Sequence, residues 1–115
     1  MKINQDKVQF LRGILIAHAS MGATITYEEL RRLARLTLEQ CGPYLEEARS
    51  VLRPGEPDFC AVAIKTAGQP GTGFGHLSLA QWEAELQKVF QYWKDRRANN
   101  NDPFVNIHGA LPPIP

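Results

Sequence analysis

Apolar residues recur at helical spacing between Gln5 and Ser20, and this stripe predicts the first helix of the chain. Polar residues occupy the opposite face of the predicted helix. Gly22 follows its last turn and suits a C-terminal cap, because glycine readily adopts the left-handed conformation that such a cap requires. The positions predicted to form the apolar stripe are Val8, Leu11, Ile14, Leu15 and His18.

Two capping patterns predict where the next two helices begin. In each, a threonine is followed three residues later by a side chain that can hydrogen-bond back to it: Glu29 after Thr26, and Gln40 after Thr37. The helix after Thr26 is predicted to bury Leu30, Leu33 and Ala34.

The Gly-Pro pair at 42–43 interrupts the helix that starts after Thr37. Proline lacks the N–H that a helix interior needs but suits a first turn, so we expect a kink or a new helix start at Pro43. The inward-facing positions of this helix, which is predicted to extend to Leu52, are Leu45, Ala48 and Leu52. Two prolines and a glycine between 53 and 57 then predict a loop.

The second half of the chain predicts one strand, one loop and one long helix. Residues 59–66 (FCAVAIKT) are nearly all apolar and are bounded by turn residues, which predicts a strand covered on both faces. Residues 67–75 (AGQPGTGFG) predict a glycine-rich loop. The final helix is capped from Ser78 and extends to Arg97, and its predicted stripe is Leu79, Trp82, Leu86, Val89, Phe90 and Trp93.

These elements predict an α+β fold, mostly helical, with a winged-helix-like three-helix core, a small β wing and a long C-terminal helix. With 115 residues the chain forms one domain, placed at 1–98, followed by a proline-rich tail at 99–115. The apolar share of 43% and the charged share of 22% exclude wholesale disorder. Because no apolar run could span a membrane and no secretory signal is present, we expect a cytoplasmic protein without membrane contact.

Four segments resemble a family of small bacterial and phage domains that have a winged-helix-like layout. They are the helix start at 26–30 (TYEEL), the apolar strand at 59–64, the loop at 68–74 and the tryptophan-bearing helix at 82–93. The likeness extends over residues 8–95, and the loop is its most specific part. The chain departs from the pattern at 65–67 and in its longer tail. The resemblance implies the fold and brings no activity with it.

A fainter resemblance is to alkylguanine-transferase-like domains, in which a Pro-Cys-His-Arg strand follows a similar helix start. Cys60 stands at the matching place, but Ala61 and Val62 follow it where that family has histidine and arginine. Without a histidine to form the thiolate, transfer chemistry is not expected. Cys41 and Cys60 are both interpreted as buried free thiols.

Five arginines form the candidate DNA-binding set: Arg31, Arg32, Arg35, Arg49 and Arg53. In a winged helix, the helix from Pro43 to Leu52 would enter the major groove of DNA. Its predicted exposed positions are Tyr44, Glu46, Glu47, Arg49 and Ser50. The two glutamates in this set would repel phosphate, and residues 24–53 hold five arginines against five glutamates. With a net charge of only +1, a solvated salt-bridge face is the competing interpretation.

The glycine-rich loop is the candidate anion site, because glycine lets several backbone N–H groups converge on one anion. The candidate contacts are Gly71, Thr72, Gly73 and His76. The loop lacks both the Gly-Lys-Ser/Thr of a P-loop and the Gly-x-Gly-x-x-Gly of a dinucleotide site. The competing interpretation is a structural turn, with glycines at positive φ and Phe74 packed into the core.

The remaining candidates for chemistry are isolated residues. No spacing of cysteine and histidine indicates a metal site, so neither a metal nor another cofactor is expected. His18 is interpreted as a residue of the core or its edge. Trp82, Phe90 and Trp93 are interpreted as core residues rather than as a stacking platform. No pair of carboxylates suited to acid–base catalysis is recognisable.

Fold and charge together predict a non-enzymatic module that binds a macromolecule, and DNA is the first partner considered. The alternative is a protein-interaction or homodimerisation module that uses the final helix and the tail. A third hypothesis is a small-anion-binding protein or an enzyme that acts through the glycine-rich loop.

Overall fold

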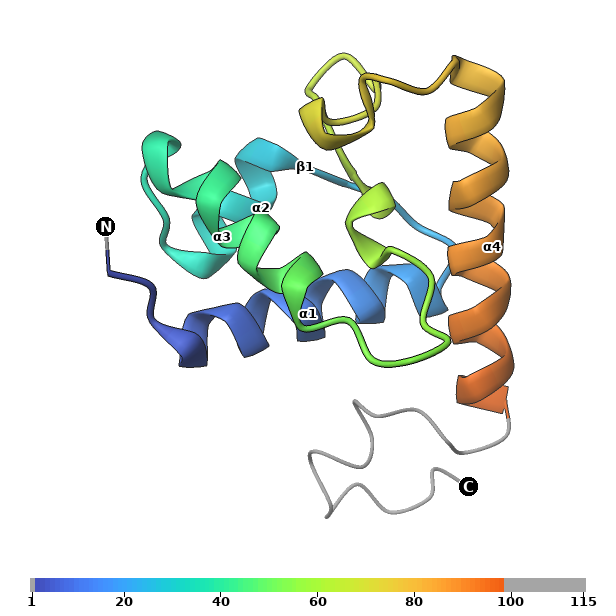
Figure 1. Cartoon of the computed structure of the whole chain (residues 1–115), viewed down its shortest axis with the longest axis horizontal. Helices are drawn as coiled ribbons and strands as arrows, with labels where there is room; N and C mark the ends of the chain where they lie inside the picture. The colour runs from blue at the N-terminus through green and yellow to red at the C-terminus, as the bar shows by residue number, and fades with distance from the viewer. Residues whose placement is uncertain (1, 99–115) are drawn as a thin grey trace.

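A computed structural model describes residues 2–98, which form a mostly helical α+β domain with a two-stranded parallel sheet (Figure 1). In chain order, the α-helices (α), strands (β) and 3-10 helices (η) are α1 (Gln5–Ser20), β1 (Ile25–Thr26), α2 (Tyr27–Ala34), α3 (Leu38–Ser50), η1 (Phe59–Val62), β2 (Ala63–Ile64), η2 (Thr72–Phe74) and α4 (Leu79–Ala98). Helix α4 stands at one end of the molecule and packs against α1. The tail predicted at 99–115, and with it the domain boundary at 98, lies outside the described residues.

Backbone hydrogen bonds at Gly22 show how α1 ends. Gly22 has φ +68°, and the N–H groups of Gly22 and Ala23 donate to the carbonyls of Ala19 (3.0 Å) and His18 (2.9 Å). These bonds satisfy carbonyls that the helix itself leaves without partners. The predicted glycine cap is confirmed.

Side-chain caps start α2 and α4. Thr26 accepts a hydrogen bond from the Glu29 N–H at 3.2 Å, but the Glu29 carboxylate pairs with Arg32, so only half of the predicted capping box is present. At α4 the exchange is complete: Ser78 accepts from the Gln81 N–H at 3.1 Å, and the Gln81 side chain accepts from the Ser78 N–H at 2.8 Å. Both predicted start sites are therefore confirmed.

Helix α3 is continuous through Pro43, so the predicted new helix start at Pro43 is wrong. The reciprocal capping box of Thr37 and Gln40 begins the helix five residues earlier. Pro43 is the sixth helical residue, where its missing N–H removes one helical hydrogen bond. A residue before proline normally avoids the helical conformation because its Cβ meets the proline ring, but Gly42 has no Cβ. The helix ends before Leu52, which packs partly buried against the core.

The strand predicted at 59–66 is wrong except at 63–64. The Asp58 carboxylate accepts from the Cys60 N–H at 3.0 Å and caps the 3-10 helix η1, which occupies 59–62. Only 63–64 is extended, and it pairs in parallel with 25–26. A wing is an antiparallel hairpin, so this pairing does not establish a winged-helix topology. The apolar run correctly predicted burial, because residues 59–63 are all buried, but burial does not fix backbone conformation.

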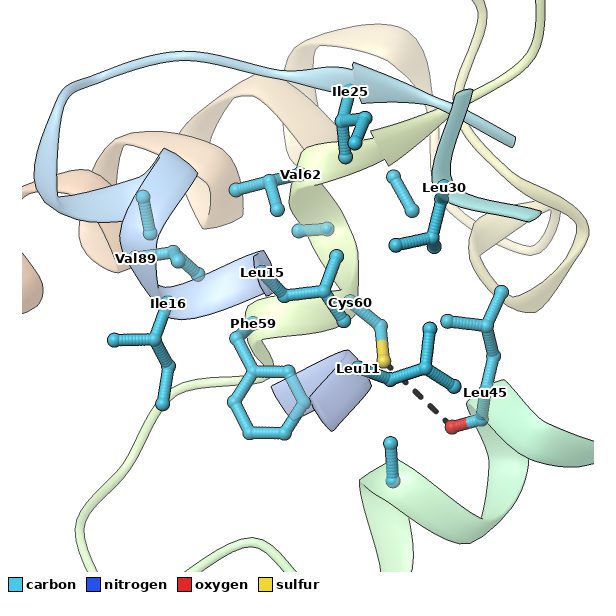
Figure 2. Packing of buried hydrophobic residues seen from close by; sticks show 14 of the residues in the cluster. Leu11, Leu15, Ile16, Ile25, Leu30, Leu45, Phe59, Cys60, Val62 and Val89 are labelled. Atoms are coloured by element: carbon cyan, nitrogen blue, oxygen red, sulfur yellow. Dashed lines mark hydrogen bonds between the residues drawn. The ribbon is translucent and has the colours of Figure 1, made fainter. Parts of the chain in front are cut away.

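The core lies where η1 is enclosed by α1, α3 and α4 (Figure 2). Phe59 and Val62 of η1, Leu11 and Leu15 of α1, and Val89 of α4 have no exposed surface. Each of these side chains belongs to a segment that could not bury it alone, so the three segments stabilise one another.

Two predicted core leucines are exposed instead. Leu33 is 46% exposed because it lies about 100° around the helix from Ala34, and the face of α2 that meets the core carries Leu30 and Ala34. Leu79 is 59% exposed in the first turn of α4. By contrast, Trp82 and Trp93 are buried as predicted, which favours the core interpretation of the tryptophans.

A buried ion pair, absent from the sequence-based predictions, joins α1 to the loop after α3. Arg12 donates from Nη1 and Nη2 to Oε1 and Oε2 of Glu56 at 2.8 and 2.6 Å, and each side chain is 4% exposed. The guanidinium also lies over the rings of Phe59 (5.3 Å) and Trp93 (5.9 Å). Burial alone would raise the pKa of Glu56, yet its hydrogen bonds from Arg12 and the Arg53 N–H lower that pKa below its ordinary value.

Candidate functional site

A cavity of about 170 Å³ lies between α2, α3, η1 and η2. Helix α3 contributes four residues at i, i+3, i+4 and i+7 to its lining, which places them on one face of that helix. The lining residues are Tyr27, Gly42, Leu45, Glu46, Arg49, Cys60, Gly73 and Phe74. The cavity thus brings together one residue from each predicted site: Arg49 from the candidate DNA-binding set and Gly73 from the candidate anion loop.

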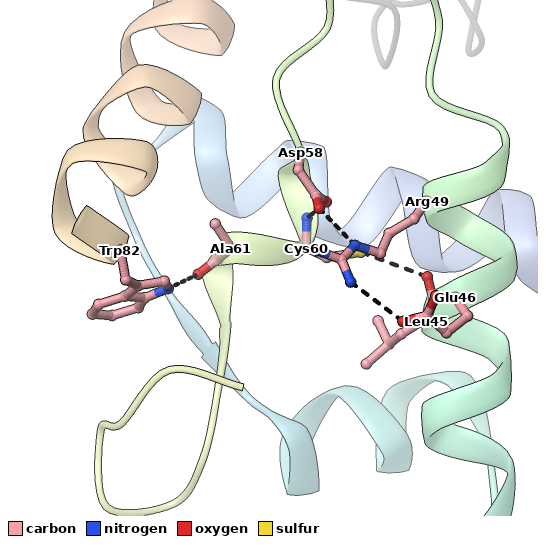
Figure 3. Close-up of polar contacts among 7 residues, drawn as sticks. All are labelled: Leu45, Glu46, Arg49, Asp58, Cys60, Ala61 and Trp82. Carbon is pink, nitrogen blue, oxygen red and sulfur yellow. Dashed lines mark hydrogen bonds and ion pairs between the residues drawn. The ribbon is translucent and has the colours of Figure 1, made fainter. Parts of the chain in front are cut away.

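Arg49 of α3 contacts the residue that caps η1 and the aromatic ring of η2, and Figure 3 shows its bonds to Asp58 and Glu46. Its Nε donates to Asp58 at 2.6 Å, its Nη1 donates to Glu46 at 3.3 Å, and its guanidinium lies 4.7 Å from the Phe74 ring centroid. Burial acts to lower the pKa of Arg49, but the hydrogen bond and negative charge of Asp58 raise it above its ordinary value. Arg49 is therefore a charged structural contact, already engaged by two carboxylates.

Cys60 lies at the buried side of the cavity, 4% exposed, and its thiol donates to the Leu45 carbonyl at 3.7 Å (Figures 2 and 3). Burial and the negative charge of Asp58 raise the pKa of Cys60 well above its ordinary value. No histidine is among the described residues that line the cavity. The site therefore holds a neutral thiol rather than the thiolate that a nucleophile needs, and the predicted buried free thiol is confirmed.

In the glycine-rich loop, close packing requires glycine at two positions, and positive φ favours it at one. Gly68 has φ +83°, but a Cβ on Gly71 would lie 1.5 Å from the Tyr27 hydroxyl oxygen, and a Cβ on Gly73 would lie 2.5 Å from Nη1 of Arg49. The predicted positive φ is therefore present at Gly68, whereas Gly71 and Gly73, which do not have positive φ, are glycines because a side chain there would meet Tyr27 or Arg49.

The residues beside Gly73 in the loop differ in exposure and in hydrogen bonding. Phe74 is 6% exposed and packs into the core as predicted, whereas His76 is exposed and does not line the cavity. The backbone N–H groups of Phe74 and Leu77 donate to loop carbonyls at 3.0 Å each, so they are engaged within the loop. The backbone of Thr72 belongs to η2, and the placement of its side chain is not described.

The remaining arginines of the candidate DNA-binding set do not share one environment. Arg31 is half-buried, and Arg32 pairs with Glu29. Arg35 is exposed and ends α2 in the left-handed conformation, with φ +56°. Arg53 is exposed, and its backbone N–H donates to Glu56 at 2.8 Å. The structure therefore brings none of these four into the cavity beside Arg49.

Helix α3 presents fewer residues for recognition than the sequence predicted. Tyr44, predicted to be exposed, is 3% exposed, and its hydroxyl accepts a hydrogen bond from the Asn4 N–H at 2.9 Å. Glu46 and Ser50 are exposed as predicted, whereas Glu47 and Arg49 are half-buried. The position of Tyr44 is set by the N-terminus of α1, which no local pattern in α3 could reveal.

Sequence reasoning did not associate Gly42, Leu45 or Tyr27 with a site. The i, i+3, i+4, i+7 spacing of 42, 45, 46 and 49 was a usable signal, because it places a glycine on the same helix face as a charged pair. A Cβ on Gly42 would meet no atom within 4 Å, so the missing side chain helps to leave the cavity open.

His18 is half-buried at the core edge, as predicted, and its Nδ1 lies 2.8 Å from the Ile14 carbonyl. Within residues 2–98, no three histidine, cysteine or acidic side chains are grouped closely enough to hold a metal ion. Over the same part of the chain, no helix has the length and apolar character needed to cross a membrane.

Comparison with protein-family models, with curated protein sequences and with solved structures finds no match to this chain. Any functional conclusion therefore depends on the geometry and charge of the described residues.

Proposed function

We propose that this protein is a non-enzymatic protein-interaction module whose cavity receives one basic side chain of a partner protein. The observation that supports this proposal is the charge around the cavity. Arg49 is the one cation in the ion-paired group, and Asp58 and Glu46 are its two carboxylates, which leaves a net charge of −1. A cation approaching the cavity is thus attracted, whereas an anion meets an arginine whose charge is already compensated.

The size and lining of the cavity fit a single side chain. A volume of about 170 Å³ accommodates a group of roughly benzene size or slightly larger. Leu45 and Phe74 offer apolar surface for the methylene stem of a lysine, while the Glu46 side chain, 71% exposed, offers its carboxylate to the ammonium group. Pockets that take one anchoring side chain are typical of protein interfaces.

A side-chain analogue tests this proposal directly. We expect Nα-acetyl-lysine-N-methylamide, titrated into 15N-labelled protein, to shift the amide signals of Gly42, Glu46 and Gly73 at millimolar concentration. The norleucine analogue, which has a similar stem without the charge, should shift them much less. Inorganic phosphate serves as the anion probe; phosphate shifts at Gly73 without lysine shifts would contradict the proposal and favour the anion hypothesis.

Two variants locate the binding. Glu46→Gln removes an exposed carboxylate and should weaken the lysine analogue about two- to fivefold, the usual range for an exposed ion pair. Gly42→Leu combined with Pro43→Ala adds a side chain at position 42, where an added Cβ meets no atom within 4 Å, and removes the proline ring that this Cβ would otherwise meet, so the double change should block the cavity while α3 stays folded. The matched control is Glu39→Gln, an exposed charge on α3 outside the cavity lining. Equal binding by all three variants would overturn the proposal.

DNA is the second candidate partner, because Lys7 of α1 lies next to the C-terminal end of α2 and adds a positive charge there. Nζ of Lys7 donates to the Arg35 carbonyl at 3.0 Å and so stands beside the arginines of α2. Ile64 and Pro70 form an antiparallel bridge, which would serve as a minimal wing in a winged-helix fold. This hypothesis predicts duplex binding at about 50 mM salt that falls steeply at higher salt and in Arg31→Glu. A wild-type protein that binds no duplex under those conditions would contradict it.

A further inference from the structure

The face of α3 that lines the cavity continues past it to an exposed leucine. Leu38 precedes Gly42 by four residues, so it lies one helical turn away, about 6 Å along the axis, on nearly the same side of the helix. It is 75% exposed, more than any other large apolar residue described within 2–98. A single exposed leucine is common on protein surfaces, but this one adjoins a cavity with an apolar and acidic lining.

Gly42 leaves a gap in this face, between Leu38 and the exposed Glu46. Gly42 and the following Pro43 are themselves exposed, and a Cβ on Gly42 would meet no atom of a non-adjacent residue within 4 Å. The backbone of a partner can therefore approach α3 closely at Gly42. A side chain that enters the cavity at this point brings the neighbouring part of its own segment to Leu38.

Charge differs between the two ends of this face. The ion-paired group at the cavity has a net charge of −1. At the Leu38 end, burial raises the pKa of the Cys41 thiol and the positive charge of Arg31 opposes this rise, which places Arg31 nearby. The charged side chains of that end, with those of α1 that reach it, are Asp6, Lys7, Glu29, Arg31, Arg32, Arg35 and Glu39. Positive charges outnumber negative ones there, so the cation of a partner is attracted to the cavity rather than to Leu38, where an apolar side chain fits instead.

On the basis of the function proposed above, we propose that the partner presents a helix with two anchors. One is the basic side chain that enters the cavity, and the other is an apolar side chain, four residues away in the partner sequence, that packs on Leu38. Side chains four residues apart lie on one face of a helix and about 6 Å apart along it, which matches the separation of Gly42 and Leu38. Helices that bind on a protein surface commonly use anchors at this spacing.

Alanine- and glutamine-based peptides of about 20 residues test the proposal, because that length allows a helix to form in water. Each peptide carries one central lysine, and two of them carry a leucine four residues before or after it. Titration into the 15N-labelled full chain, followed at the amides of Gly42, Glu46 and Gly73, measures the affinity. We expect the better of the two to bind about three- to tenfold more tightly than the peptide without leucine, since only part of each leucine is buried at one helix contact.

Two further peptides test the spacing and the charge. A leucine two residues from the lysine lies about 200° around a helix, but on the same face of an extended segment, so it should bring no gain. A second lysine in place of the leucine should bring no gain either, because positive charges prevail near Leu38.

Variants of the protein locate the second anchor. Leu38→Ser should abolish the gain from the peptide leucine and leave the affinity of the peptide without leucine unchanged. Leu33→Ser replaces an exposed leucine of α2 outside the cavity lining, so this matched control should leave both affinities unchanged. Far-ultraviolet circular dichroism confirms that each variant is folded.

Equal affinities of the peptides with and without leucine would overturn the proposal, and so would a gain that survives Leu38→Ser. A peptide with leucine two residues from lysine that binds most tightly would overturn the helical conformation. In each of these cases the lysine analogue would still shift the cavity amides, and the function proposed above would stand. Absence of the analogue shifts as well would overturn both, so the two failures are distinguishable.

Discussion

Replacing Glu56 by glutamine tests whether the buried ion pair stabilises this domain as its geometry implies. The Arg12 and Glu56 side chains are each 4% exposed and are joined by two hydrogen bonds of 2.8 and 2.6 Å. Glutamine keeps one acceptor but leaves the Arg12 charge without a counterion in a site that excludes water. Removing one partner of a buried pair costs about 3–5 kcal/mol, so a large share of a typical domain stability of about 5–15 kcal/mol would be lost.

Urea unfolding followed by tryptophan fluorescence measures this loss, because Trp82 and Trp93 are buried in the folded domain. The matched control is Glu85→Gln, which breaks the exposed pair of Glu85 with Lys88 and should cost less than about 1 kcal/mol. The double variant Arg12→Met with Glu56→Gln should be less destabilised than Glu56→Gln alone, since it leaves no unpaired buried charge.

The dependence on pH gives a second measure of the same pair. The pKa of Glu56 is lower in the folded protein than its ordinary value of 4.5. Its contribution is therefore fully present above about pH 4.5 and is lost as the pH falls through the lower, folded value. Acidification should destabilise the wild type more than Glu56→Gln. Equal stability of Glu56→Gln and Glu85→Gln at neutral pH, or identical acid profiles of Glu56→Gln and wild type, would refute the reasoning.

Three further predictions concern single residues. Arg35→Gly should raise the free energy of unfolding by about 0.5–1 kcal/mol, because Arg35 has φ +56°, a conformation that glycine adopts without strain. Arg32→Gly, within the same helix, should instead lower the free energy of unfolding by a similar amount. Urea unfolding of the two variants measures both changes. Pro43→Ala restores a helical N–H, so it should raise the free energy of unfolding by about 1–3 kcal/mol and the melting temperature with it. An unchanged or lower melting temperature would contradict the packing described for α3. Because Cys60 is buried and its pKa is raised well above the ordinary value, its thiol should react with a maleimide at pH 8 much more slowly in the folded protein than in urea. Comparable rates would show that the thiol is accessible.

Local signals in the sequence determined most helix starts and ends. The caps at Thr26, Thr37 and Ser78 and the glycine at 22 depend on hydrogen bonds that span three to five residues, so the sequence contains all the partners. Pro43 is the exception among them. Its local signal predicted a helix start, yet the capping box upstream and the absence of a Cβ at Gly42 allow α3 to continue through it.

Burial was predicted better than conformation or pairing. The apolar run at 59–63 is buried as expected, but its burial is compatible with either a strand or a 3-10 helix, and the cap from Asp58 selects the helix. The parallel pairing of 25–26 with 63–64 joins segments that lie 38 residues apart in sequence. No turn between neighbouring segments fixes such a register, so only the packed domain decides it.

The sequence by itself determined a mostly helical domain with a buried tryptophan-bearing helix, free cysteines and balanced charge, because these follow from composition and from contacts within a few residues. Only the tertiary structure decided which charges are compensated. Arg12 finds Glu56 44 residues away, and Arg49 finds Asp58 across the turn between α3 and η1. An ion pair between distant segments depends on how the segments pack, and that packing placed Arg49 and Gly73 around one cavity instead of in two separate sites.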